Sequence, residues 1–170
     1  MKIISGGVCA AKGFKASGVH CGIRKNRTKR DLALIYSEKV ANAAAVYTTN
    51  LVKGAPLVVT KNHIADGKAQ AVICNSGNAN TCNPDGVEKA ETMCKALSEK
   101  LGIDENDVIV ASTGVIGQTL DVQPIINGIP TLISELDSSP EAGYCAAAAI
   151  MTTDTGLKQI AAEITLSGKT

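Results

Sequence analysis

The chain has 170 residues, enough for one domain with a sizeable core, and its 17 basic and 16 acidic side chains give a formal net charge of +1. This balance offers no electrostatic basis for binding nucleic acid or a membrane surface. Hydrophobic residues make up 45% of the chain and aromatic residues only 2%. We therefore expect a core of Ala, Val, Ile and Leu, as in layered α/β proteins, and no stacking on bases or sugars.

The first half of the chain alternates apolar runs with turn signals, which predicts a series of short strands. The expected strands are 19–23, 31–37, 43–48, 56–60 and 70–74. The basic run 24–30, between the first two strands, is interpreted as a solvated hairpin turn rather than a phosphate-binding patch.

In the second half, the spacing of apolar residues becomes helical. An Asn- and Gly-rich loop is expected at 75–80 and a tight loop at 112–117, after a buried strand at 108–111. Helices are expected over 84–101, over 120–136 in two pieces divided by Gly128 and Pro130, and over 140–149, before a last strand at 158–166. This order favours a single α/β layered domain over residues 1–170 rather than a helical bundle.

The 6 cysteines form no C-x-x-C pair, so a zinc or iron–sulfur site is disfavoured. No signal peptide opens the chain, and no apolar run reaches membrane-spanning length. We therefore expect a cytoplasmic protein with reduced and mostly buried thiols.

Three segments could carry chemistry. The Ser-Thr-Gly-Val-Ile-Gly segment at 112–117 could offer a hydroxyl and a backbone N–H to a developing oxyanion, or could simply be a strand-to-helix turn. The carboxamides of 75–80 could orient a polar ligand or hold a loop. The Met-Thr-Thr-Asp-Thr segment at 151–155 could line a pocket or cap a helix.

The sequence offers no convincing attacking group. His20 and His63 have no serine or cysteine elbow beside them, and no G-x-S-x-G occurs. The cysteines lack a local activating environment, which argues against a thiol nucleophile. The residues alone therefore predict stabilising groups without a nucleophile.

Taken together, these motifs resemble the glutamate N-acetyltransferase/ornithine acetyltransferase family of arginine biosynthesis. The pair of motifs N-S-G-N-A-N and S-T-G-V-I-G is far more specific than either motif alone. The matching stretches follow the order of the family and cover nearly the whole chain: 12–14 with Gly18 and Gly22, 31–35, 47–50, 55–56, 75–80, 112–117 and 151–155.

The resemblance implies a layered, N-terminal-nucleophile-like α/β architecture, in which this chain is the α chain of a self-cleaved precursor and a β chain completes the fold. In the family, the new N-terminal threonine of the β chain is the nucleophile. It follows a Lys-Gly-Ser-Gly loop and Asn-Met-Ala, a pattern absent around Thr170, so Thr170 is not expected to act as the nucleophile. The implied assembly has two α and two β chains.

The implied reaction is ping-pong acetyl transfer from N-acetylornithine to glutamate, with acetyl-CoA as a further donor in some members and with no metal or organic cofactor. Matching the family's motifs onto this sequence implies that Thr113 and Gly114 are the catalytic oxyanion pair, that Thr152 binds substrate, and that 75–80 supports the site. Two alternatives stay open. One is a related self-cleaving aminopeptidase or amidohydrolase subunit, in which water replaces glutamate. The other is a non-catalytic binding module.

Overall fold

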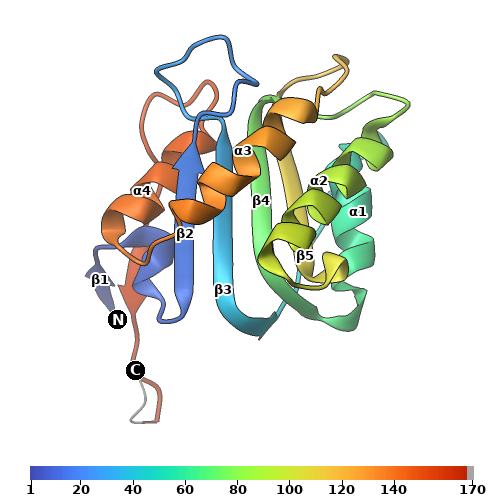
Figure 1. The fold of residues 1–170 in the computed structure, drawn as a ribbon. Helices are drawn as coiled ribbons and strands as arrows, with labels where there is room; N and C mark the ends of the chain where they lie inside the picture. Colours follow the sequence, from blue (N-terminus) through green and yellow to red (C-terminus); the bar gives the residue numbers. More distant parts are fainter. Residues whose placement is uncertain (168–170) are drawn as a thin grey trace.

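A four-stranded sheet in the order β2-β3-β4-β5 forms the centre of the computed structural model, which describes residues 1–167. Its strands are β2 (Phe14–Val19), β3 (Leu32–Asn42), β4 (Lys68–Asn78) and β5 (Val108–Val115). β2, β3 and β4 are antiparallel neighbours, whereas β4 and β5 run parallel. A separate antiparallel pair joins β1 (Lys2–Ile4) to β6 (Ala161–Glu163), so segments near the two ends of the chain lie together (Figure 1).

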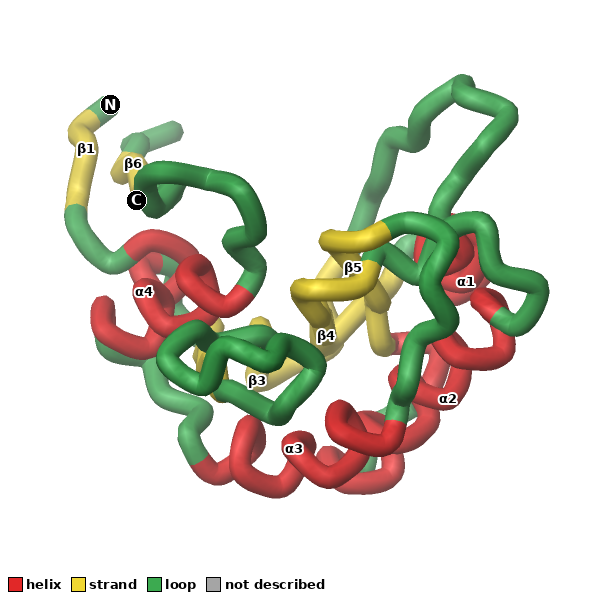
Figure 2. The backbone as a smooth tube through the Cα atoms, turned by 90° about the horizontal axis from the view of Figure 1, so that it is seen from above, coloured by secondary structure: helices red, strands yellow, loops and turns green. Residues whose placement is uncertain are grey.

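Helices pack on both faces of the central sheet (Figure 2). One face is covered by α1 (Ala55–His63), α2 (Gly86–Leu101) and α3 (Gln123–Ser134). The other face carries α4 (Pro140–Ala149), which packs on β2 and β3. Short 3₁₀ helices complete the chain at Gly7–Ala10, Ile64–Asp66 and Glu105–Asp107.

The core follows the alternation of side chains along the strands. Leu32 and Leu34 of β3 are fully buried on the face toward α1, α2 and α3, in one apolar cluster with Met93 and Ile125. On the opposite face the side chains are small. Ala16 and Ala33 pack there against the alanines of α4, so α4 approaches the sheet closely. The layered α/β class expected from the sequence is confirmed.

The α4 face of the sheet is left partly open. Beside α4 lies a groove of about 440 Å³. Its floor comes from the sheet, and its walls come from α4 and from residues 158–160, which add the polar side chains of Lys158 and Gln159. Most of the lining is apolar, including Ile35, Val72, Cys74, Ala111, Ala147 and Ile150. Apolar sheet surface in this position is normally covered by another layer.

Several predicted elements are confirmed. α4 coincides with the expected helix 140–149, α2 occupies most of 84–101, and β6 lies within 158–166. The expected strands at 31–37, 70–74 and 108–111 are found as β3, β4 and β5, which extend further. The basic run connects the antiparallel strands β2 and β3, as a hairpin turn should.

Two predicted strands are wrong. Segment 56–60 lies in α1, where Pro56 occupies the first turn and Val59 and Thr60 are buried on one helical side. Packing on β5 and α2 therefore overrides the strand preference of a valine-rich run. Segment 43–48 is irregular, and Val46 is 99% exposed, so this apolar run has no neighbouring strand.

Other boundaries also differ from the prediction. β2 ends at Val19, so most of the expected strand 19–23 is a loop. The expected loops at 75–80 and 112–117 begin as continuations of β4 and β5, through Asn78 and Val115. The two helical pieces expected in 120–136 form one helix, α3, with Pro130 inside it. The apolar face of α3 is buried in the core, which outweighs the hydrogen bond lost at the proline.

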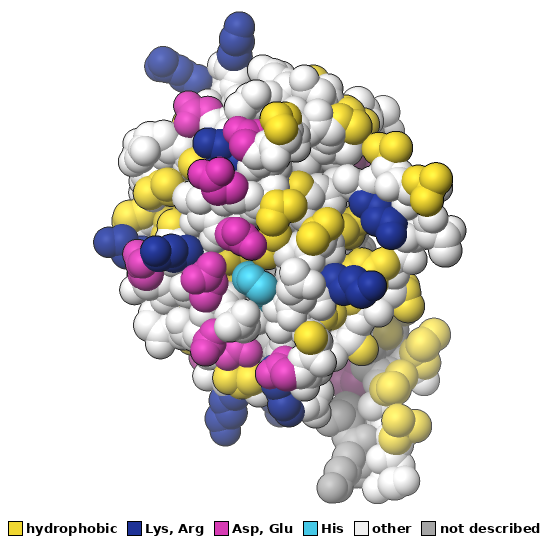
Figure 3. All heavy atoms as spheres, turned by 90° about the vertical axis from the view of Figure 1, so that its right-hand side faces the viewer, with side chains coloured by type: hydrophobic (Ala, Val, Ile, Leu, Met, Phe, Trp, Pro, Cys, Tyr) yellow, Lys and Arg dark blue, Asp and Glu magenta, His cyan; other side chains and the backbone are white. Residues whose placement is uncertain are grey.

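The face of the molecule drawn in Figure 3 carries both acidic and basic side chains. Among the helices of residues 1–167, none combines the length and apolar character needed to cross a membrane. Thr170 lies outside the described residues.

Candidate active site

The candidate site lies at the carboxyl ends of the parallel strands β4 and β5. Gly77 pairs with Gly114 across these strands. Gly114 has φ +133°, and a β-carbon built on it would lie 2.3 Å from the carbonyl carbon of Gly77. Neither a side chain nor an ordinary backbone angle is compatible with this approach, so the glycine at position 114 is required by geometry.

Thr113 lies next to this contact. It is half-buried, and it pairs in register with Ser76 and, across a bulge, with Asn78. Within residues 1–167, its hydroxyl has no hydrogen-bond partner, and Gly114 is exposed. The two predicted catalytic residues are therefore adjacent at an accessible strand end, and the Thr113 hydroxyl is free to donate to a ligand.

The Asn-rich motif acts as a scaffold for this strand end. Asn75 is fully buried, donates to the Asn78 carbonyl at 3.0 Å and accepts from the Ser112 hydroxyl. Asn78 donates to the Gln118 carbonyl at 2.8 Å. Asn80 donates to the carbonyl of Gly86, where α2 begins. The carboxamides thus tie β4 to β5 and to the loop after it, in agreement with the supporting role expected for 75–80.

The predicted substrate-binding residue, Thr152, follows α4 and is half-buried. Two hydrogen bonds hold the end of α4 and the residues after it. The hydroxyl of Ser76 donates to the Ala149 carbonyl, and the Arg24 guanidinium donates to the Met151 carbonyl. The first bond links the end of α4 to β4, and the second links the 151–155 segment to the loop after β2.

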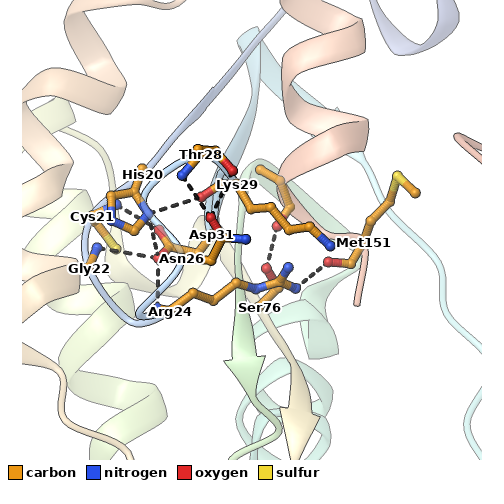
Figure 4. A network of polar contacts seen from close by, with 11 residues as sticks. His20, Cys21, Gly22, Arg24, Asn26, Thr28, Lys29, Asp31, Ser76 and Met151 are labelled. Carbon is orange, nitrogen blue, oxygen red and sulfur yellow. Dashed lines mark hydrogen bonds and ion pairs between the residues drawn. The ribbon is translucent and has the colours of Figure 1, made fainter. Parts of the chain in front are cut away.

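A buried carboxylate shapes the loop that carries Arg24 (Figure 4). The Asp31 side chain is fully buried at the start of β3 and accepts from the amides of Cys21 at 2.6 Å and Arg24 at 2.9 Å. The Gly22 amide also donates to it, at 3.3 Å. The Nδ1 atom of His20 lies 3.1 Å from the same carboxylate. Such a buried charge needs several donors, and the loop backbone provides them.

Sequence reasoning missed Arg24 and Asp31. It treated the basic run as solvated, which holds for the exposed residues 25–30 but not for half-buried Arg24. The partner of Arg24 lies 127 residues away along the chain, beyond the reach of any local pattern. The sequence signal for Asp31 is an acidic residue directly before an apolar strand, since Asp31 immediately precedes β3.

Three buried or half-buried thiols show no activation. Burial raises the pKa of Cys94 to about 12 and that of Cys74 to about 11. Burial, followed by the nearby Asp31 carboxylate, raises the pKa of Cys21 to about 12. These thiols stay protonated at neutral pH and are poor nucleophiles. Within residues 1–167, no cluster of three or more His, Cys, Asp or Glu residues could hold a metal ion.

The fold and the paired strand ends define a layered α/β protein with a candidate anion-stabilising site. The family model named ArgJ matches residues 15–170, and the chain belongs to the ArgJ family. It is 49% identical to the arginine biosynthesis bifunctional protein ArgJ of Caldanaerobacter subterraneus, over 99% of this chain and 41% of that protein. It is 45% identical to the glutamate N-acetyltransferase of Methanocaldococcus jannaschii, over 100% of this chain and 41% of that protein.

Solved structures agree with the sequence relatives. The ornithine acetyltransferase of Mycobacterium tuberculosis, solved in complex with ornithine, superposes with a TM-score of 0.88 at 36% identity, covering 94% of this chain and 86% of that one. The ArgJ protein of Bacillus halodurans gives a TM-score of 0.84 at 42% identity, covering 91% and 82% of the two chains. The chain spans about 41% of the length of the first curated relative.

Proposed function

We propose that this chain is the α subunit of an acetyltransferase that moves an acetyl group from N-acetylornithine to glutamate. The observation that carries the proposal is the Gly77–Gly114 contact, because it presents Thr113 and Gly114 together at an accessible strand end. The printed names of relatives support the substrates: one is a glutamate N-acetyltransferase, and another is an ornithine acetyltransferase holding ornithine.

The proposed mechanism is ping-pong, through an acetyl-threonine on a partner β chain. The threonine oxygen attacks the acetyl carbonyl of N-acetylornithine, and the threonine amine takes its proton. The Thr113 hydroxyl and the Gly114 N–H stabilise the resulting oxyanion. Collapse of this intermediate releases ornithine, which takes up the proton. The amino group of glutamate then attacks the acetyl ester, the threonine amine passes the proton that glutamate loses to the threonine oxygen, and N-acetylglutamate leaves with the free threonine regenerated.

Thr152 is proposed to bind the amino-acid part of the substrate. Its support is a pair of hydrogen bonds: one ties the end of α4 to the strand that also carries Gly77, and the other ties Met151 to the loop after β2. Substrate binding and oxyanion stabilisation would then be organised by the same strand end.

The partner chain is proposed to cover the open face of the sheet. The apolar groove beside α4 supports this, as do Val115 and Ile116, which are 54% and 64% exposed next to the candidate site. Residues 1–170 would be a single domain within an α2β2 enzyme of the cytoplasm. Expressed without its partner, the chain should aggregate, because this apolar surface would meet water.

The proposal is tested on the enzyme produced from its complete gene. Mass spectrometry and N-terminal sequencing of the purified protein should find a second chain beginning with threonine. Ornithine release from N-acetylornithine should depend on glutamate and yield N-acetylglutamate. Release that is independent of glutamate would identify a hydrolase instead. The absence of both a second chain and acetyl transfer would support the alternative that this chain is a non-catalytic binding module.

A further inference from the structure

Arg24 connects the two halves of the candidate site. Its side chain leaves the loop after β2 and passes over Gly77, where a β-carbon would lie 3.0 Å from Arg24 Cγ. Its guanidinium reaches the main-chain carbonyl of Met151 (Figure 4). Arg24 therefore touches the residue that faces Gly114 and also holds the peptide that precedes Thr152.

That peptide is held through its carbonyl group. Its carbonyl oxygen, on Met151, accepts from the Arg24 guanidinium. Because the peptide unit is planar, a hydrogen bond that fixes the direction of this carbonyl also restricts the direction in which the Thr152 side chain leaves the backbone.

The loop that bears Arg24 holds the start of its side chain in place. The Arg24 amide donates to buried Asp31 at 2.9 Å, and the Asp31 carbonyl accepts from the Ser76 amide at 2.8 Å. The start of the Arg24 side chain is thus anchored to the same strand as Gly77. No carboxylate within residues 1–167 forms an ion pair with Arg24, so its described polar side-chain contact is the Met151 carbonyl.

We infer that Arg24 is a positioning residue that aims Thr152 at the substrate, and that it acts on substrate binding through Thr152. The inference rests on the proposed function in taking Thr152 as the substrate-binding residue. A charge-assisted hydrogen bond to a carbonyl is strong enough to select one orientation of a peptide in a loop. Its loss should therefore weaken ornithine binding more than it slows the chemical step at Thr113.

A double-mutant cycle on the complete enzyme tests this, with ornithine affinity measured by calorimetry and turnover measured in parallel. Arg24→Met should weaken ornithine binding about tenfold, the order expected on losing one charge-assisted hydrogen bond, and should raise KM with kcat within about threefold. In the Thr152→Ala background, Arg24→Met should have almost no further effect on ornithine affinity. Arg24→Lys keeps a donor and should recover part of the affinity.

The matched control is Arg27→Met, which removes a charge from an exposed position of the same loop and should leave ornithine affinity unchanged. Additive losses from Arg24→Met and Thr152→Ala would overturn the inference, and so would an equal loss from Arg27→Met. If Arg24→Met does not fold, the double-mutant cycle is measured with Arg24→Lys in its place. Failure of the wild-type enzyme to bind ornithine would instead overturn the proposed function, and the inference with it.

Discussion

Gly77 and Gly114 are in backbone contact across β4 and β5, and this contact leaves no room for a β-carbon at position 114. The parallel strands approach so closely because position 114 lacks a side chain. Both glycines have positive φ, +111° and +133°, but a β-carbon on Gly77 would meet the side chains of Ile23 and Arg24 rather than β5. The approach also determines where Thr113 emerges, since the threonine directly precedes Gly114. Strand pairing and the candidate oxyanion site thus both depend on Gly114.

Gly114→Ala should destabilise the enzyme strongly. The added methyl group combines a positive φ, which costs a non-glycine residue about 1–2 kcal/mol, with a clash against backbone that cannot move aside, for a total of about 3 kcal/mol or more. The control is Gly117→Ala, where φ is +75° but no atom lies within 4 Å of the added carbon. Gly117→Ala should lose only the stability that a positive φ costs a non-glycine residue. Thermal unfolding of both variants measures the difference, and equal losses would refute the clash.

Asp31→Asn should loosen the loop that carries Arg24. The buried carboxylate accepts from several backbone amides. In Asn, an NH2 group replaces one of the two carboxylate oxygens, so a hydrogen-bond donor would face these backbone N–H donors. We expect a loss of about 2–3 kcal/mol. Asp121→Asn, at an exposed carboxylate that accepts from the Gln123 amide at 3.0 Å, should cost far less. The measurement is the denaturant midpoint of unfolding of each variant, and similar midpoints for Asp31→Asn and Asp121→Asn would contradict the role given to Asp31.

The local parts of this structure could be predicted from sequence, and the parts set by distant contacts could not. The helix α4 was predicted with its exact bounds because its proline start and alanine-rich interior are local signals. Segment 56–60, within α1, has the local signature of a strand because its valines favour strands, but its packing on β5 stabilises a helix instead. The Thr113–Gly114 motif was recognisable along the chain. The Arg24–Met151 contact was not, because it exists only once the fold brings the two segments together.

The stability of the enzyme should fall at alkaline pH as buried thiols ionise. The pKa values of Cys94 and Cys74 are raised in the folded state from 9.0 to about 12 and about 11. Groups with raised folded pKa values contribute stability that is fully present below the unfolded value, near pH 9, and that is lost as pH rises toward the folded values. The urea midpoint should therefore drop between pH 8 and pH 10.5. Cys94→Val should show a smaller drop, whereas Cys82→Ser, at an exposed thiol, should match the wild type.

Thr113→Ala should slow catalysis without weakening the fold. The Thr113 hydroxyl has no hydrogen-bond partner within the described residues, and its side chain is only half-buried, so its removal leaves no buried group unsatisfied. Loss of one oxyanion donor typically costs about 3–4 kcal/mol of transition-state stabilisation, or roughly a hundred- to a thousand-fold in rate. We expect kcat of the purified variant to fall by this factor, with much smaller changes in substrate affinity and in thermal stability.

Two further variants separate this role from a general effect of the loop. Thr113→Ser keeps a hydroxyl at the same carbon and should recover part of the rate, since a donor is again available to the oxyanion. Thr119→Ala removes an exposed hydroxyl a few residues along the same loop and should leave kcat unchanged. A kcat for Thr113→Ala within about threefold of wild type, far from the loss expected for an oxyanion donor, would exclude Thr113 from the mechanism. The close approach of Gly77 and Gly114 would then be a feature of strand packing alone.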